Sequence, residues 1–301
     1  MWSWRLRVCL VLLSAALLVG LSGCNGSAEL TRAPDATSYT FDARVTEEQR
    51  AEITAAVATT ADWLASQAAM PMPVLHITAA PDGDVFTEGL AGRYRMTASD
   101  AGGILATIPA AAALTVGHDI LLIVDDRWKS LGPETRSFVI AHEIFHVVQY
   151  VLAAGPADAP AGGNIPGPAW LVEGAAEFVA ANVMSASGGR SIEQFRREYE
   201  ARGRMLGGRL GDLENVSAHA ASSAQGQYTL GFLAAGRLAS RSGTSSLLGL
   251  WRSYGQGASW ERAFRDTFGE SVAAFSEEFD AHLTVDTAAP IRARPGPRRS
   301  R

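Results

Sequence analysis

The spacing of apolar residues changes along the chain. Helical spacing over 46–67 precedes two short apolar runs, 73–78 and 119–124, which predict β-strands. Residues 80–117 show no clear period, and we expect one or two further strands and loops there. After Pro133 apolar residues recur every three or four positions, which predicts helices over 133–153, 170–184, 191–206, 224–241, 244–254, 258–268 and 271–284. Strands first and helices later predict an α+β fold.

The N-terminus has the pattern of a bacterial export signal. Basic residues precede an apolar run, Val8 to Val19, which is too short to span a bilayer. The run ends in Leu21-Ser22-Gly23-Cys24, which resembles the lipobox of bacterial lipoproteins. That resemblance implies cleavage before Cys24, diacylation of its thiol, and an exported protein anchored to the bacterial membrane or envelope. An ordinary signal peptide with an incidental cysteine is the alternative.

Composition divides the rest of the chain. We predict a lipoprotein signal peptide over 1–24, a flexible tether over 25–45, one folded domain over 46–286 and a basic disordered tail over 287–301. Without the seven arginines of the leader and of 292–301, 19 basic residues face 31 acidic ones, so the body carries about −12 and nucleic-acid binding is disfavoured. Both cysteines lie in the leader, so only histidines and carboxylates could hold a metal in the body.

The helix over 133–153 contains His142-Glu143-Ile144-Phe145-His146, an HExxH motif. Residues four apart lie on one helical face, so both imidazoles can reach one zinc ion. Glu143 then lies beside the metal, where it can accept a proton from water. A chance occurrence of the motif is the alternative. Catalytic zinc needs a third protein ligand and an open position.

The next helix carries two carboxylates among apolar residues. In Trp170-Leu-Val-Glu-Gly-Ala-Ala-Glu-Phe178, Glu173 and Glu177 lie one turn apart. Buried carboxylates need a metal or hydrogen-bond partners. The alternative is a solvated acidic stripe.

HExxH followed by W-L-x-E-G-x-A-E-F resembles the gluzincin metallopeptidases, the clan of thermolysin and aminopeptidase N. The resemblance implies a zincin-like fold, in which a small N-terminal sheet packs on a mainly helical half and the metal lies in the cleft between them. It implies one Zn²⁺ per chain, held by His142, His146 and Glu173, with Glu177 orienting one zinc histidine. It also implies that strand 119–124 is an edge strand that pairs with extended peptide substrate.

Tyr228 is the remaining candidate for catalysis. Tyr228-Thr-Leu-Gly231 resembles the Y-x-x-G segment of the aminopeptidase N type, in which the tyrosine stabilises the oxyanion. Packing at a helix start is the alternative for Tyr228, and His219 could be the donor in its place. No G-x-M-E-N-like segment precedes HExxH, so endopeptidase and exopeptidase action both stay open.

Together these patterns predict a zinc metallopeptidase at the cell envelope that hydrolyses peptide or protein substrates. Glu143 is the expected base and Tyr228 the expected oxyanion donor. Two alternatives stay open. One is a catalytically degenerate zincin-fold lipoprotein that acts as a binding or scaffold module, and the other is a zinc hydrolase of a non-peptide bond.

Overall fold

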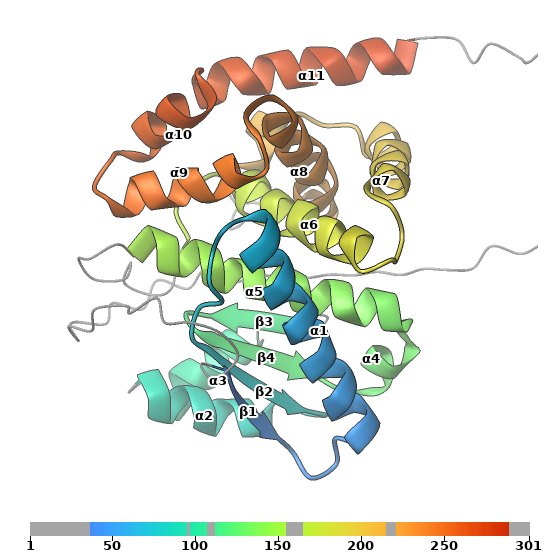
Figure 1. The fold of residues 1–301 in the computed structure, drawn as a ribbon, viewed down its shortest axis with the longest axis vertical. Coiled ribbons are helices and arrows are strands. Elements are labelled where there is room, and N and C mark those ends of the chain that lie inside the picture. The colour runs from blue at the N-terminus through green and yellow to red at the C-terminus, as the bar shows by residue number, and fades with distance from the viewer. Residues whose placement is uncertain (1–36, 95–96, 107–111, 155–164, 215–220, 289–301) are drawn as a thin grey trace, which may run out of the picture.

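The structure is a computed structural model that describes residues 37–94, 97–106, 112–154, 165–214 and 221–288. The leader with Cys24, the tail from 289 and His219 lie outside the described residues. Helices predominate over one small sheet, as expected for an α+β fold (Figure 1). The elements in chain order are β1 (Thr37–Phe41), α1 (Glu47–Gln67), β2 (Leu75–Ala80), α2 (Asp84–Tyr94), α3 (Ala98–Ala106), β3 (Ala113–Val116), β4 (Asp119–Ile123), α4 (Asp126–Ser130), α5 (Pro133–Ala154), α6 (Ala169–Ala186), α7 (Ile192–Leu206), η2 (Leu210–Leu213), α8 (Ala221–Ser242), α9 (Ser245–Gly255), α10 (Trp260–Phe268) and α11 (Val272–Ala288).

The sheet has the strand order β1-β2-β4-β3. Strands β1, β2 and β4 are parallel, and β3 pairs antiparallel with β4. The expectation that strand 119–124 lies at the edge is therefore wrong, because β4 has a neighbour on each side. The outer strand beside β4 is β3, which follows from the short turn that joins the two strands as a hairpin.

Two expectations from the sequence, one for residues 37–41 and one for residues 80–117, need correction. The composition predicts a flexible tether at residues 37–41, but they form β1, where Tyr39 and Phe41 pack against the main core. Alternating aromatic and polar residues suit a strand with one covered face. Residues 80–117 hold the expected additional strand, β3, but also the helices α2 and α3.

Each face of the sheet has its own apolar core. Leu75, Ile77 and Ile120 belong to the large core shared with α1 and α5. Ala80 and Leu121 belong to a smaller core with α2 and α3. Because strand side chains alternate between faces, the same strands contribute to both cores.

Helix α5 is the centre of the molecule. It lies between the sheet and the later helices (Figure 1). It is long and apolar enough to cross a membrane, but 89% of its most apolar stretch is buried inside the protein, so it is a core helix. Residues on every side of α5 are buried, including those of the HExxH motif.

Helices α6 and α8 cross at two glycines. A Cβ atom on Gly174 would lie 2.1 Å from the carbonyl carbon of Gly231. A Cβ atom on Gly231 would lie 2.2 Å from the carbonyl oxygen of Trp170. No larger residue fits at either position without moving a backbone. The crossing brings Glu173, beside Gly174, close to the middle of α8.

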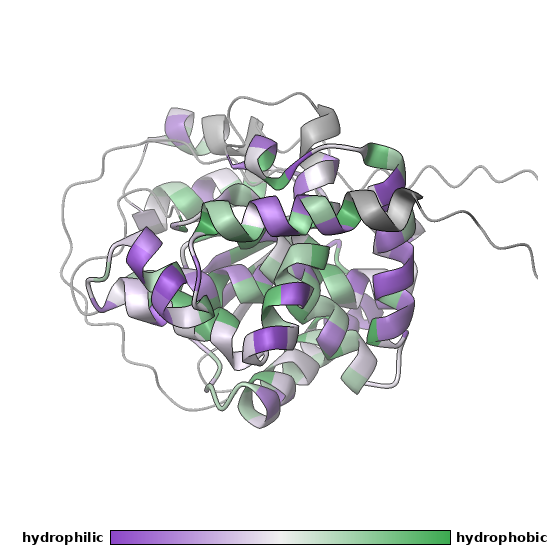
Figure 2. Ribbon diagram, turned by 90° about the horizontal axis from the view of Figure 1, so that it is seen from above, coloured by the Kyte–Doolittle hydropathy of each residue, from purple (hydrophilic) through white to green (hydrophobic). Residues whose placement is uncertain are grey.

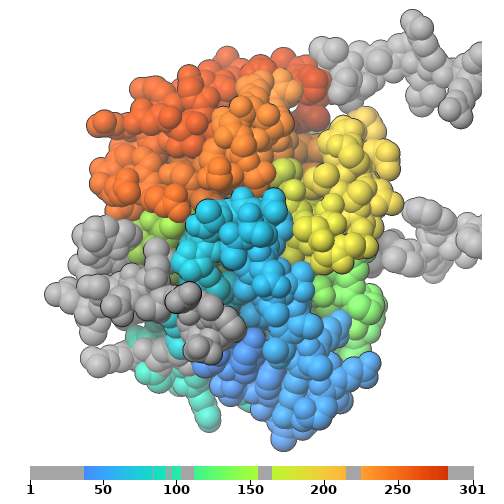
Figure 3. All heavy atoms as spheres, viewed as in Figure 1, coloured from blue at the N-terminus to red at the C-terminus, as the bar shows by residue number. Residues whose placement is uncertain are grey.

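The outer helices are amphipathic and cover this centre. Figure 2 shows hydrophilic and hydrophobic residues distributed around them. In α7, the buried residues Phe195, Tyr199 and Gly203 are four apart and form one face. On the face shown in Figure 3, the N-terminal part (blue) lies directly against later helices (yellow and orange).

Candidate metal centre

The predicted site residues come from three helices that pack together. His142, Glu143 and His146 lie on α5, and Glu173 and Glu177 lie on α6. All five side chains are buried, with at most 4% of each residue exposed. This excludes a solvated acidic stripe on α6. The described residues do not establish the expected cleft, which stays a prediction.

Three potential ligand atoms converge at one point. The Nε2 atoms of His142 and His146 are 2.9 Å apart. The Oε2 atom of Glu173 lies 3.4 Å and 3.3 Å from them. In the described part of the chain, they are the one group of at least three histidine, cysteine or acidic side chains whose ligand atoms all lie within 4.8 Å of one another.

The partners of the outer imidazole nitrogens assign the tautomers. Gln149 donates its amide to the carbonyl oxygen of Val172 over 3.0 Å, so its Oε1 atom, 2.8 Å from His146 Nδ1, must accept a proton from it. Glu177 Oε1 lies 3.2 Å from His142 Nδ1, close but not aligned as a hydrogen bond, and a carboxylate can only accept. When both rings are neutral and protonated on these outer nitrogens, both Nε2 atoms carry lone pairs.

The convergence of these lone pairs is the test for a metal. The two Nε2 atoms face each other, with their lone pairs opposed when both rings are neutral, and the buried Oε2 atom of Glu173 beside them makes no hydrogen bond. Such an arrangement is repulsive unless a cation lies between the groups. Two imidazoles and one carboxylate are a zinc donor set with a free fourth position. The residues present thus fit a zinc ion.

The electrostatics show the same demand for positive charge. Burial lowers the pKa of His142, but contacts with Glu173 and Glu177 outweigh it and raise the pKa to about 10. Burial raises the pKa of Glu173, but the neighbouring imidazoles of His146 and His142 bring it well below its ordinary range. The cluster therefore takes up a cation, either a proton or a metal ion.

Glu143 is held by the sheet. The hydroxyl of Thr115 on β3 lies 2.7 Å from Glu143 Oε2 and 3.0 Å from the Glu143 carbonyl oxygen, and it can donate to either. The carboxylate that the motif marks as a base is thus adjacent to the outer strand of the sheet.

Tyr228 on α8 completes the group. Its ring centroid lies 6.0 Å from that of His142. Burial raises the pKa of Tyr228 well above its ordinary value, and the charge of Glu173 is the next largest cause. The phenol therefore keeps its proton at neutral pH and can donate a hydrogen bond.

Sequence reasoning missed Thr115, Gln149 and Tyr199, which contact the predicted residues. Only Gln149 had a local signal, since it is a polar residue one turn after His146 in an apolar helix. The remaining histidines in the described residues are elsewhere. His76 bonds Ser38 and His118 lies near the Val74 carbonyl, both at the sheet, and His282 lies on α11.

Comparison with known proteins gives a limited result. No protein-family model matches the chain, and no curated protein matches it. Among solved structures, it is similar to an M1 zinc metallopeptidase from Deinococcus radiodurans, with 15% identity, a TM-score of 0.43, and coverage of 86% of this chain and 50% of the other.

A mutant of that enzyme bound to a Tyr-Ser-Ala substrate gives 15% identity and a TM-score of 0.43, covering 85% of this chain and 48% of the other. This chain thus spans about half the length of these structures. These values do not assign the chain to a family, and the case for the site rests on its geometry.

Proposed function

We propose that this protein is a zinc-dependent hydrolase of peptide bonds that acts at the bacterial cell envelope. The observation that carries the proposal is the convergence of two imidazole Nε2 atoms and a buried carboxylate oxygen on one point. Glu143, next to this point, supplies the base that hydrolysis needs. The resemblance of HExxH…WLxEG to gluzincins supports peptides as the substrate class.

In this proposal His142, His146 and Glu173 hold the zinc ion. When bound, zinc polarises the scissile carbonyl and makes water more acidic. Glu143 accepts a proton from water as the water oxygen bonds to the carbonyl carbon. Tyr228 donates a hydrogen bond to the carbonyl oxygen as negative charge develops there. Glu143 then passes the proton to the leaving nitrogen as the C–N bond breaks.

In this mechanism the extended peptide substrate pairs with strand β3. We transfer the peptide-pairing role from β4, which is internal, to β3, which is the outer strand beside it. An extended peptide that adds to an edge strand gains main-chain hydrogen bonds. Thr115 on β3 contacts Glu143, so a peptide paired there would lie near the base.

The test combines metal content with turnover. The purified protein should hold about one zinc per chain, as a site of one His/His/carboxylate set requires. Glu173→Ala should lose that zinc. Glu143→Gln should keep it but lose cleavage of a peptide library. A parent protein that takes up no zinc on reconstitution contradicts the proposal. Zinc without cleavage would favour the binding or scaffold alternative, and cleavage of esters alone would favour a non-peptide hydrolase.

The location is proposed from the leader sequence. We propose that Cys24 is diacylated after export, which would anchor the domain to the membrane. Labelled palmitate should be incorporated into the protein in cells and not into Cys24→Ser. Equal labelling of both would contradict the anchor.

A further inference from the structure

Glu177 has a buried partner on α7. The hydroxyl of Tyr199 donates a hydrogen bond to Glu177 Oε2. The other carboxylate oxygen, Oε1, faces His142 Nδ1 at 3.2 Å. Tyr199, Glu177 and His142 thus form a chain from an outer helix to a zinc ligand.

Tyr199 is suited to fix this carboxylate. Only 5% of the residue is exposed, and its ring stacks on Phe232 of α8 with centroids 4.0 Å apart. Burial raises the pKa of Tyr199 well above its ordinary value, so the hydroxyl stays a donor. The ring stack fixes where the hydroxyl lies, and the hydroxyl fixes which oxygen of Glu177 remains for His142.

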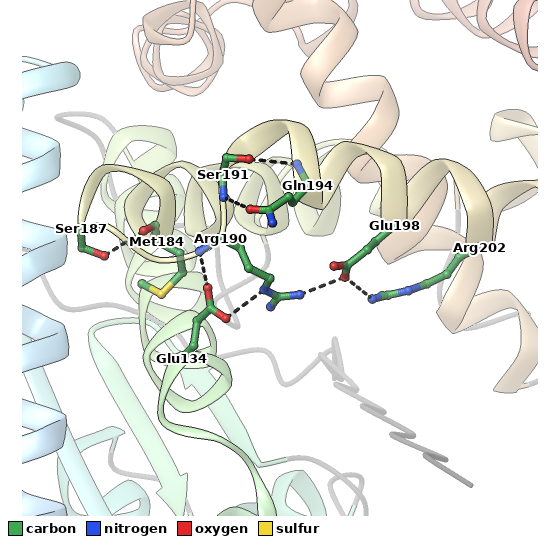
Figure 4. Close-up of polar contacts among 8 residues, drawn as sticks. All are labelled: Glu134, Met184, Ser187, Arg190, Ser191, Gln194, Glu198 and Arg202. Atoms are coloured by element: carbon green, nitrogen blue, oxygen red, sulfur yellow. Dashed lines mark hydrogen bonds and ion pairs between the residues drawn. The ribbon is translucent and has the colours of Figure 1, made fainter. Parts of the chain in front are cut away.

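Helix α7 is itself attached to α5. Figure 4 shows Arg190 between Glu134 of α5 and Glu198 of α7. The Arg190 backbone amide donates to Glu134 over 2.7 Å, and its guanidinium bonds Glu134 and Glu198, each over 2.9 Å. The guanidinium of Arg202 lies over the ring of Tyr199 at 4.8 Å. The bonds from Arg190 to Glu134 tie the start of α7 to the helix of the HExxH motif, and the contact of Arg202 with Tyr199 lies within α7.

We propose that Tyr199 is a positioning residue of the metal centre, which acts on His142 by orienting Glu177. The proposal rests on the proposed zinc site. It extends the centre to α7, an element with no ligand or base. The hydroxyl also offsets part of the cost of burying a third carboxylate beside Glu143 and Glu173.

A second tyrosine–carboxylate pair supplies the control. In the sheet region, the Tyr94 hydroxyl lies 2.5 Å from Asp119 Oδ2 and 2.5 Å from the Val116 carbonyl oxygen. Burial also raises the pKa of Tyr94. Neither Asp119 nor Val116 is one of the residues proposed to hold the metal. Tyr94→Phe therefore removes a comparable hydroxyl without touching the chain to His142.

The experiment measures zinc affinity by chelator competition, and the visible spectrum of the cobalt-substituted protein. Tyr199→Phe should weaken zinc binding about 10-fold, the low end for loss of an outer partner of a ligand. Its cobalt spectrum should shift. Tyr94→Phe should leave both unchanged. In a Glu177→Ala background, Tyr199→Phe should have little further effect on affinity, because no side chain is left for Tyr199 to orient against His142.

Several results would overturn the proposal. Equal zinc affinity and spectra for Tyr199→Phe and Tyr94→Phe would overturn the role of Tyr199 while the zinc site stands. A parent protein without zinc would overturn both. Full additivity with Glu177→Ala would show that Tyr199 acts by another route.

If Tyr199→Phe does not fold, proton magnetic resonance of the parent provides the test. The buried Tyr199 hydroxyl should give a low-field signal that is absent in Glu177→Gln and moves when zinc is added. The Tyr94 hydroxyl should give one that zinc does not move. A Tyr199 signal unmoved by zinc would overturn the proposal.

Discussion

The two histidines of the proposed centre are held in different ways. His142 faces a carboxylate, Glu177, which a second helix orients through Tyr199. His146 faces a neutral amide, Gln149, whose NH₂ group donates a hydrogen bond to the Val172 carbonyl of α6. One side of the centre thus adds negative charge to the site. The other side adds orientation only.

This difference assigns distinct tasks to the two sides. A carboxylate on the outer nitrogen makes an imidazole a stronger metal donor and increases the attraction of the site for a cation. An amide on the outer nitrogen fixes the tautomer and the ring plane. Because Gln149 bonds the backbone just before Glu173, it also ties the two ligand helices, α5 and α6, together.

The largest expected effect comes from breaking both sides at once. Gly231→Ala would place a Cβ atom 2.2 Å from the Trp170 carbonyl oxygen of α6. Helices α6 and α8 must then move apart, and α6 carries Glu173, Glu177 and Val172. We expect the free energy of unfolding to fall by about 3 kcal/mol, the upper end for overpacking, with loss of zinc. Urea denaturation and metal analysis measure the two effects.

Gly89→Ala is the matched control. Gly89 is an exposed residue in α2, and a Cβ atom there meets nothing within 4 Å. Alanine should raise stability by up to about 1 kcal/mol through helix propensity. If Gly231→Ala behaved like Gly89→Ala, the close crossing of α6 and α8 would not be needed for the centre.

The next effect separates the two sides. Glu177→Gln keeps the shape of the side chain and removes its charge, and we expect about 100-fold weaker zinc binding. Gln149→Leu removes orientation without changing charge, and we expect about 10-fold weaker binding. Equal losses in chelator competition would mean that charge contributes nothing beyond orientation.

The same two variants should rank in the opposite order when the free energy of unfolding is measured. Gln149→Leu leaves His146 Nδ1 and the Val172 carbonyl without partners inside the core. That should cost about 1–3 kcal/mol for each group. Glu177→Gln keeps an oxygen for His142 and leaves a group that can still pair with Tyr199. Denaturation of the metal-free proteins should therefore rank Gln149→Leu as the less stable.

A smaller effect is expected at Glu143, the proposed base, whose carboxylate lies against Thr115 of β3. Thr115→Val removes the hydroxyl that contacts Glu143 and retains the branched shape. We expect zinc affinity to be unchanged and kcat to fall about 10-fold, the value of one hydrogen bond to a charged group. Thr115→Ser should restore most of the rate. A loss of zinc in Thr115→Val would show that the strand supports the ligands as well.

The two converging histidines could be predicted from the sequence, because their spacing is a property of one helix. His142 and His146 lie one turn apart whatever surrounds them. Glu173 and Tyr228 came from resemblance, and the structure adds a local reason for their motifs. The glycines of E-G and Y-x-x-G, Gly174 and Gly231, are the two that let α6 and α8 meet.

The sequence could not predict what depends on tertiary packing. Thr115 and Tyr199 are ordinary residues in a strand and an amphipathic helix, and only the fold places them beside Glu143 and Glu177. Strand order is likewise set by long-range pairing, so the internal position of β4 had no local signal. Strand β1 did have one, in the alternation of Thr37, Tyr39 and Phe41, which its polar surroundings concealed.

The smallest effect is expected at an exposed carboxylate. Glu278 on α11 bonds Arg241 and Arg237, whose guanidinium groups lower its pKa to about 2. Since the pKa is lowered on folding, any stabilisation is present above the unfolded value near 4.5 and is lost as pH falls from 4.5 towards 2. Solvent screens such a pair, so Glu278→Gln should shift Tm only slightly at pH 7, and the two proteins should converge at low pH. Zinc affinity should not change. If Glu278→Gln weakened zinc binding as much as Glu177→Gln, the loss would reflect the total charge of the protein, and the contrast between the two histidine partners would have no local cause.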